Sequence, residues 1–175
     1  QDAYMDVNWS NKIGAAVESA AVLHAFGVNL VVEWTNIGIG RNVLALRSVP
    51  CQSNVHFVCP TGIYKDLKSP VLANVSIAQM ADHFVSELAT GIDGTGIRAG
   101  FVKTSCNESG ATRKDVGILR AAAIAAKQTG AAPGQEAEKG NIFSGPATGT
   151  GKPENVNWLM SFQRHNFVFD SQLLL

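Results

Sequence analysis

The chain is 175 residues long and 46% of its residues are hydrophobic, which is enough for one domain with a sizeable core. Fourteen basic residues balance fourteen acidic ones, so no net charge attracts nucleic acid or an anionic membrane. No apolar run approaches the roughly 20 residues that a membrane span needs. We therefore expect a single globular domain over residues 1–175 that binds neither nucleic acid nor membrane.

The cysteines and the first residues bear on the cellular compartment. Cys51, Cys59 and Cys106 are odd in number and widely spaced, which fits neither a disulfide framework nor a structural zinc site. The start of the chain lacks the basic and apolar regions of a signal peptide, and it begins at Gln1 rather than Met. We expect a cytoplasmic protein, and the chain reads as either a processed product or a piece of something longer.

Up to about residue 130, helical and strand-like segments alternate, each closed by a loop or a glycine. Gly27 follows a helical stretch at the position of a typical helix stop. Apolar runs without helical spacing then predict buried strands. The elements expected in the first half are, in order, a helix over 12–26, a strand over 28–35, a glycine-bearing loop over 36–41, a short helix over 42–47 and a strand over 55–59, followed by the loop that holds Tyr64.

Two later helices carry explicit start signals. Ser76 and Gln79 form a capping box ahead of apolar residues at helical spacing, and Thr112 and Asp115 form a second one. His83 falls on the polar face of the first of these helices. The stripe expected to be buried on the second helix consists of Val116, Leu119, Ala122, Ala123 and Ala126.

Between these two helices, residues 98–106 read as a strand that ends near Lys103. Strands that alternate with amphipathic helices predict a parallel sheet, whose ligand sites lie beyond the carboxyl ends of the strands. Lys103, Tyr64 and the loop 38–41 all follow strand ends, so we expect them to share one rim of the sheet.

The last part of the chain follows a different pattern. Residues 140–153 have the composition of a loop, and residues 156–175 are apolar without any period. We predict no helix or strand there.

Lys103 is the residue whose chemistry bears most directly on function. An ammonium group cannot bind a metal, but a neutral lysine amine reacts with carbon dioxide to give a carbamate, which is a carboxylate on a long arm. Such a group can bridge two divalent cations that together generate hydroxide at neutral pH. The plainer alternative is a solvated lysine at a strand end, with its stem covering apolar surface.

Five segments are distinctive in combination: 31–35, 38–42, Thr61-Gly-Ile-Tyr64, 91–103 and 120–130. Together they resemble the phosphotriesterase family of the amidohydrolase superfamily, closest to its lactonase branch. The resemblance covers roughly residues 4–139 and leaves 140–175 as a poorly matched tail. It implies an α/β fold of the parallel (β/α) TIM-barrel type, incomplete in this chain, with two divalent metal ions at the carboxyl rim: zinc, or else cobalt, iron or manganese.

The resemblance also implies roles for individual residues. Lys103 matches the carbamylated lysine that bridges the two metals, and Tyr64 matches an aromatic residue that lines the substrate pocket beside them. Both are therefore predicted catalytic residues. Arg41 matches an arginine that supports the rim, and its plainer interpretation is a loop arginine that pairs with a nearby carboxylate.

Most of the family's histidine ligands have no counterpart in this chain. The chain begins just downstream of the place where the family carries a His-x-His pair on its first strand. The fifth strand should end in a histidine, yet residues 134–138 are Gly-Gln-Glu-Ala-Glu. His24, His56 and His83 match no ligand position and are interpreted as packing or surface residues, and His165 falls in the tail.

Two functions of different classes remain open. The first is a metal-dependent hydrolase that attacks small-molecule lactones, esters or organophosphate triesters with a metal-activated hydroxide. The second is a catalytically incompetent half-barrel that acts as a binding or interaction module. A generic α/β binding module with Lys103 as an anion anchor is weaker, since no glycine-rich phosphate loop opens a helix. The unpaired strand edges of a half-barrel also predict self-association into a homo-oligomer.

Overall fold

The structure, a computed structural model, describes residues 9–64, 74–105, 111–137 and 140–143. Cys106, His165 and the segment 156–175 lie outside the described residues, so the predictions made for them are not addressed. Among the described helices, none is both long enough and apolar enough to cross a lipid bilayer.

The first half of the chain contains the predicted elements, with shifted ends and two additions, α3 and β3. The strand expected over 28–35 is wrong in length, because only three of its residues pair. After the last of them, the carboxylate of Glu33 accepts the backbone N–H of Thr35 at 2.9 Å, and such local bonds compete with a ladder. The elements are α1 (Trp9–Ala25), β1 (Leu30–Val32), α2 (Val43–Arg47), α3 (Pro50–Ser53), β2 (His56–Val58) and β3 (Pro60–Thr61).

In the second half, both predicted capping boxes are confirmed. The Ser76 hydroxyl accepts the Gln79 N–H at 3.2 Å, and the Thr112 hydroxyl accepts the Asp115 N–H at 3.1 Å, while each partner side chain bonds back. The elements are α4 (Ile77–Ala89), the 3-10 turn η2 (Ile92–Gly94), β4 (Phe101–Ser105), α5 (Arg113–Thr129), β5 (Ala132–Ala137) and β6 (Gly140–Phe143).

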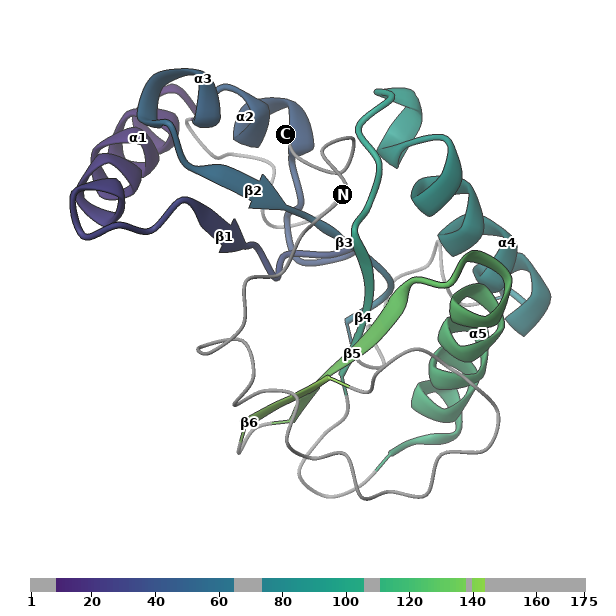
Figure 1. Cartoon of the computed structure of the whole chain (residues 1–175). Coiled ribbons are helices and arrows are strands. Elements are labelled where there is room, and N and C mark those ends of the chain that lie inside the picture. Colours follow the sequence, from purple (N-terminus) through teal and green to yellow (C-terminus); the bar gives the residue numbers. More distant parts are fainter. Residues whose placement is uncertain (1–8, 65–73, 106–110, 138–139, 144–175) are drawn as a thin grey trace.

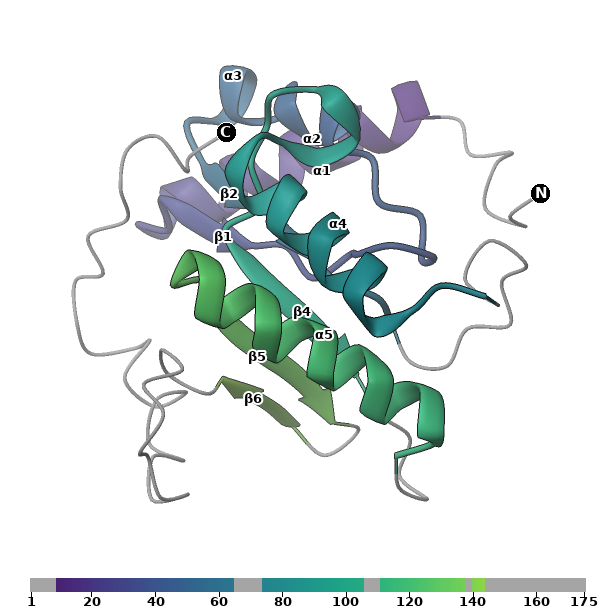
Figure 2. The same cartoon turned by 90° about the vertical axis from the view of Figure 1, so that its right-hand side faces the viewer.

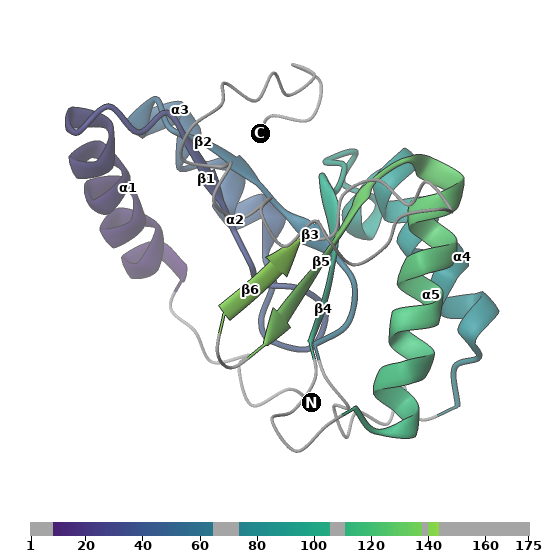
Figure 3. The same cartoon turned by 60° about the horizontal axis from the view of Figure 1, so that its bottom comes forward.

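The strands from β1 to β5 run parallel to their neighbours and are arranged in chain order. β1 pairs with β2, β3 with β4, and β4 with β5. Only Cys59 separates β2 from β3, and its carbonyl accepts the Gly100 N–H at 2.9 Å. Consecutive order with helical crossovers is the arrangement of a barrel wall. The described strands form an open arc and do not close a barrel (Figures 1 and 3).

One strand runs against this direction. β6 pairs antiparallel with β5, from Gly134 opposite Phe143 to Ala137 opposite Gly140. The predicted loop over 140–153 is therefore wrong for its first four residues. A short strand can form there without any apolar period, because its backbone pairs with the edge of β5 (Figure 3).

The main core lies between the sheet and the pair α4 and α5, which run side by side across β4 and β5 (Figure 2). The stripe predicted for α5 is confirmed at Ala122 and Ala126, which are buried, and is wrong at Val116, which is 39% exposed, and at the exposed Ala123. An added Cβ at Gly117 would already touch Ile77 and Met80 of α4. The small side chains along this line let α4 approach closely, so the buried residues of α5 are Asp115, Ile118, Ala121, Ala122, Ala125 and Ala126.

Candidate functional site

Lys103 lies in the middle of β4, whose five residues are all buried. Successive side chains of a strand point to opposite faces, and Val102 belongs to the core under α4 and α5. Lys103 therefore lies on the other face of the sheet, away from these helices. Its residue is only 2% exposed, so the alternative of a solvated strand-end lysine is wrong.

The amine of Lys103 is surrounded by two aromatic residues. Nζ donates a hydrogen bond to the backbone carbonyl of Trp34 at 2.5 Å. The same atom lies 5.4 Å from the ring centre of Trp34 and 5.0 Å from that of Tyr64, within the range of cation–π attraction. The Trp34 ring also meets Phe101 edge to face at 5.3 Å between ring centres. These contacts fix the amine against the loop that follows β1.

The backbone of Lys103 is held as closely as its side chain. Its carbonyl accepts a hydrogen bond from the amide nitrogen of Asn36 at 3.1 Å. A Cβ on Gly62 would lie 2.0 Å from that same carbonyl oxygen, so only glycine allows the two backbones to approach this closely. The Gly62 carbonyl in turn accepts the Ile37 N–H at 3.2 Å. The loop after β1, the turn after β3 and β4 thus meet at Lys103.

The structure brings Lys103 and Tyr64 together, from β4 and from the end of the preceding strand segment. The loop 38–41 does not join them as expected. Its Arg41 points instead to α4, where the guanidinium forms a two-point ion pair with Glu87 at 2.6 and 2.7 Å and donates to the Pro60 carbonyl at 3.2 Å. The interpretation of Arg41 as a loop arginine that pairs with a carboxylate is confirmed.

Glu87 is the centre of a buried polar cluster. Burial alone would raise the pKa of Glu87, but hydrogen bonds from His83 and Arg41, together with the charge of Arg41, lower it to about 2. The hydrogen bond to Glu87 raises the pKa of His83 despite partial burial. His83 Nε2 lies 3.2 Å from Glu87, and Asp93 completes the cluster 3.5 Å from Arg41. The cluster anchors the loop after β1 to α4.

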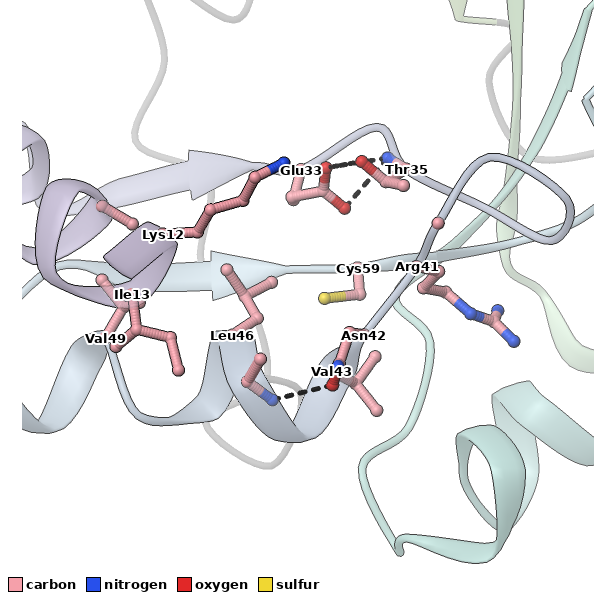
Figure 4. A pocket seen from close by; sticks show the side chains of 13 residues that line it. Lys12, Ile13, Glu33, Thr35, Arg41, Asn42, Val43, Leu46, Val49 and Cys59 are labelled. Atoms are coloured by element: carbon pink, nitrogen blue, oxygen red, sulfur yellow. Dashed lines mark hydrogen bonds between the residues drawn. The ribbon is translucent and has the colours of Figure 1, made fainter. Parts of the chain in front are cut away.

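A cavity of about 190 Å³ lies between the first turn of α1, α2 and the segment after β1 (Figure 4). Lys103 and Tyr64 are not among its lining residues. The carboxylate of Glu33 at its edge already accepts the Thr35 N–H and hydroxyl. Burial, with the negative charge of Glu33, raises the pKa of the lining Cys59 thiol to about 12, so no thiolate nucleophile is present at neutral pH. The cavity is separate from the lysine site.

The described residues do not assemble a complete metal site. A catalytic metal ion takes about three protein ligands, and within the described ranges no three His, Cys, Asp or Glu side chains lie together. His24 and His56 are exposed, and His83 is bonded to Glu87. Cys51 and Cys59 are free thiols. Lys103 is the residue in this part of the chain to which the family resemblance assigns a bridging position, through its carbamate.

Sequence analysis missed three residues that hold the site. Trp34 and Asn36 were assigned to a strand and a loop with no role, since the folding of that loop over β4 leaves no local signature. Glu87 left a signal that could have been used: it is an acidic residue three positions after Phe84, inside the apolar stripe of α4. An acid at such a position must be paired when the helix packs.

Parallel strands in chain order, with a buried lysine in the middle of β4 on the face away from the helices, define an α/β protein. The sequence profile of the phosphotriesterase family matches residues 1–140. The chain therefore belongs to the phosphotriesterase family. This family implies a TIM-barrel fold of the amidohydrolase type, and the described residues show an α/β arrangement of parallel strands without a closed barrel.

Individual relatives agree with this assignment. The chain is 39% identical over 105 residues to an aryldialkylphosphatase of Saccharolobus solfataricus, covering 59% of this chain and 33% of that protein. It is 33% identical over 128 residues to a phosphotriesterase homology protein of Mycobacterium tuberculosis, covering 69% and 39%. It is 30% identical over 122 residues to an N-acetyltaurine hydrolase of Mus musculus, covering 69% and 35%. The chain thus spans little more than a third of the length of these relatives.

Proposed function

We propose that Lys103 is the bridging ligand of a metal-dependent hydrolase that cleaves lactones or organophosphate triesters. The observation that carries the proposal is the burial of the Lys103 amine between Trp34 and Tyr64 on the face of the sheet opposite α4 and α5. Family members are generally dependent on two metal ions, and the relatives' names are those of hydrolases.

Each residue has a defined task in this proposal. The neutral Lys103 amine forms a bond to the carbon of carbon dioxide, one C=O electron pair moves to oxygen, and one proton leaves the nitrogen. The resulting carbamate supplies two oxygens that can hold a divalent pair, zinc or else cobalt, iron or manganese. When bound, such ions polarise a carbonyl or phosphoryl oxygen and lower the pKa of water. Tyr64 lies beside the amine and orients the substrate through its hydroxyl.

A second candidate function is a catalytically incompetent half-barrel that binds other molecules or its own copies. The observation that favours it is that no three His, Cys, Asp or Glu side chains lie together among the described residues. We therefore expect hydrolysis from a chain that also carries the remaining ligands, and little or no turnover from the 175 residues alone. Self-association through the edge of β1 that no described strand covers belongs to the same candidate.

Metal content by elemental analysis, with bicarbonate present and absent, tests the proposal together with turnover of a lactone and a phosphotriester. In the chain that carries all ligands, Lys103→Ala should remove most turnover. A short carboxylic acid in solution should restore part of it by occupying the bridging position. Lys127→Ala, which changes an exposed lysine of α5, is the matched control and should leave both readouts unchanged. Full turnover and both metals in Lys103→Ala would contradict the bridging role.

The 175-residue chain separates the two candidates further. Metal bound in proportion to bicarbonate would support the hydrolase assignment even without turnover. Size-exclusion chromatography that shows a dimer or larger species, with no metal uptake, would favour the binding module.

A further inference from the structure

Two neighbouring residues of the loop after β1 contact opposite ends of Lys103. The Trp34 carbonyl accepts Nζ at 2.5 Å, while the Asn36 side-chain nitrogen donates to the Lys103 backbone carbonyl at 3.1 Å. Ile37 then pairs with the turn after β3, through its bond to Gly62 and its parallel bridge to Ile63. The loop is therefore tied to Lys103 at the backbone and at the tip of the side chain.

Asn36 is fully buried, and its side chain bonds to a residue that lies 67 positions later in the sequence. Within the described part of the chain, its Oδ1 atom has no hydrogen-bond partner. A buried amide that uses only one of its two polar ends is less stable than a fully paired one. Packing alone does not explain an asparagine here, because an apolar side chain would fill the same space without this cost. The bond that Asn36 donates to Lys103 does explain it.

We propose that Asn36 is a positioning residue for Lys103. Together with the Trp34 carbonyl, it fixes the direction in which the carbamate group on Nζ points. This inference rests on the proposed carbamylation of Lys103. The carbamate nitrogen keeps a single N–H after the bond to carbon dioxide forms and the proton leaves. The Trp34 carbonyl is the acceptor for that N–H, so the two carbamate oxygens are directed away from Trp34.

The consequence concerns the direction of the side chain. Without the hydrogen bond from Asn36 to the Lys103 carbonyl, the loop after β1 is no longer held at a fixed distance from the backbone of β4. Nζ then loses its fixed distance to the Trp34 carbonyl and to the two rings.

Asn36→Leu is the test variant, because leucine has nearly the shape of asparagine and removes both the donor and the unpaired acceptor. The matched control is Ser53→Ala, which removes another buried side-chain-to-backbone bond, to Val49 at 2.8 Å, far from the site. The primary readout is the NMR signal of the Lys103 ε-protons in lysine-labelled protein without bicarbonate, assigned by its loss in Lys103→Met. Protons held over aromatic rings are shifted upfield, so this signal should stand apart from exposed lysines.

In Asn36→Leu the Lys103 signal should move at least halfway toward that of exposed lysines, at a temperature where thermal unfolding shows the fold intact. Ser53→Ala should leave it in place. Asn36→Ser keeps a donor on a shorter arm and should lie between the wild type and Asn36→Leu, and it stands in if the leucine variant fails to fold. An unchanged signal in the folded variants would overturn the positioning role.

A second readout keeps the two proposals apart. Added ¹³C-labelled bicarbonate should give a carbamate carbon signal in the wild type that is weakened several-fold in Asn36→Leu. No carbamate in the wild type, together with a ring-shifted Lys103 signal that depends on Asn36, would reject carbamylation and keep the positioning role. A wild-type carbamate signal that is unchanged in Asn36→Leu would support carbamylation and reject the positioning role.

Discussion

Arg41 and Glu87 form a two-point ion pair in which Nη1 meets Oε2 at 2.7 Å and Nη2 meets Oε1 at 2.6 Å. The side chains are 6% and 2% exposed, so the pair is almost completely removed from water. It joins the loop after β1, which also carries Trp34 and Asn36, to α4. The position of that loop over Lys103 therefore depends on a charge pair located on the helix side of the sheet.

Removing one partner of this pair should be costly. Glu87→Leu leaves the Arg41 guanidinium buried without its main counter-charge, and we expect the free energy of unfolding to fall by about 3–5 kcal/mol. Arg41→Met should cost a similar amount. The double variant should be more stable than either single one, because an apolar pair leaves no buried charge. Urea denaturation measures all three, and strictly additive losses would contradict the pairing.

The exposed Glu18 of α1 provides the control for this series. Glu18→Gln should change the free energy of unfolding by less than about 0.5 kcal/mol, as expected for a surface substitution.

Because of the hydrogen bond between His83 and Glu87, the free energy of unfolding should fall as the pH rises from 6 to 8.5. The pKa of His83 is raised in the folded protein above 6.5, mainly by its hydrogen bond to Glu87, with Arg41 opposing and Asp93 supporting the shift. A raised pKa contributes stability that is complete below 6.5 and is lost as pH rises through the folded value. Urea midpoints at pH 6 and pH 8.5 should therefore differ in the wild type.

His83→Gln should remove that difference, while His24→Gln, which changes an exposed histidine of α1, should retain it. The effect should be modest because the His83 side chain is half exposed. An equal pH dependence in His83→Gln and the wild type would show that another group is responsible.

Gly62 should tolerate no side chain. Its φ of +110° is unfavourable for other residues, and a Cβ would lie 2.0 Å from the Lys103 carbonyl oxygen. We expect Gly62→Ala to lower the free energy of unfolding by at least about 2 kcal/mol. Gly14→Ala in α1 is the opposite case, because its Cβ meets nothing within 4 Å, and it should stabilise by about 0.5–1 kcal/mol. Thermal unfolding of both variants checks the contrast.

Local sequence rules found the helices because their signals are local. The Ser76 and Thr112 capping boxes and the helix stop at Gly27 each involve neighbours within a few residues, and all three appear in the structure, where Gly27 has a φ of +83°. The strand at Lys103 was found by the same kind of rule, through its apolar run and the turn that follows. Tyr64 was placed near Lys103 because parallel strands end on the same edge of a sheet.

Local sequence rules could not identify the residues that hold the site, because their contacts join distant parts of the sequence. The bond from Asn36 to Lys103 spans 67 positions and that from Arg41 to Glu87 spans 46, so no local pattern indicates them. The buried stripe of α5 was partly misplaced for a related reason. Alanines and Gly117 surround that helix on several sides, and the side that packs is decided by Ile77 and Met80 of α4. Tertiary contacts overrode a weak helical pattern.

The hydroxyl and the ring of Tyr64 should have separable effects. Tyr64→Phe keeps the ring that lies 5.0 Å from Lys103 Nζ and removes one hydrogen-bonding group, worth about 1 kcal/mol. In a chain with all metal ligands, it should therefore change the preference between a lactone and a phosphotriester by up to about tenfold, with metal content unchanged. Tyr64→Leu removes the ring as well and should also shift the NMR signal of the Lys103 ε-protons. Loss of metal in Tyr64→Phe, measured by elemental analysis, would make the tyrosine a ligand and contradict its role in orienting the substrate.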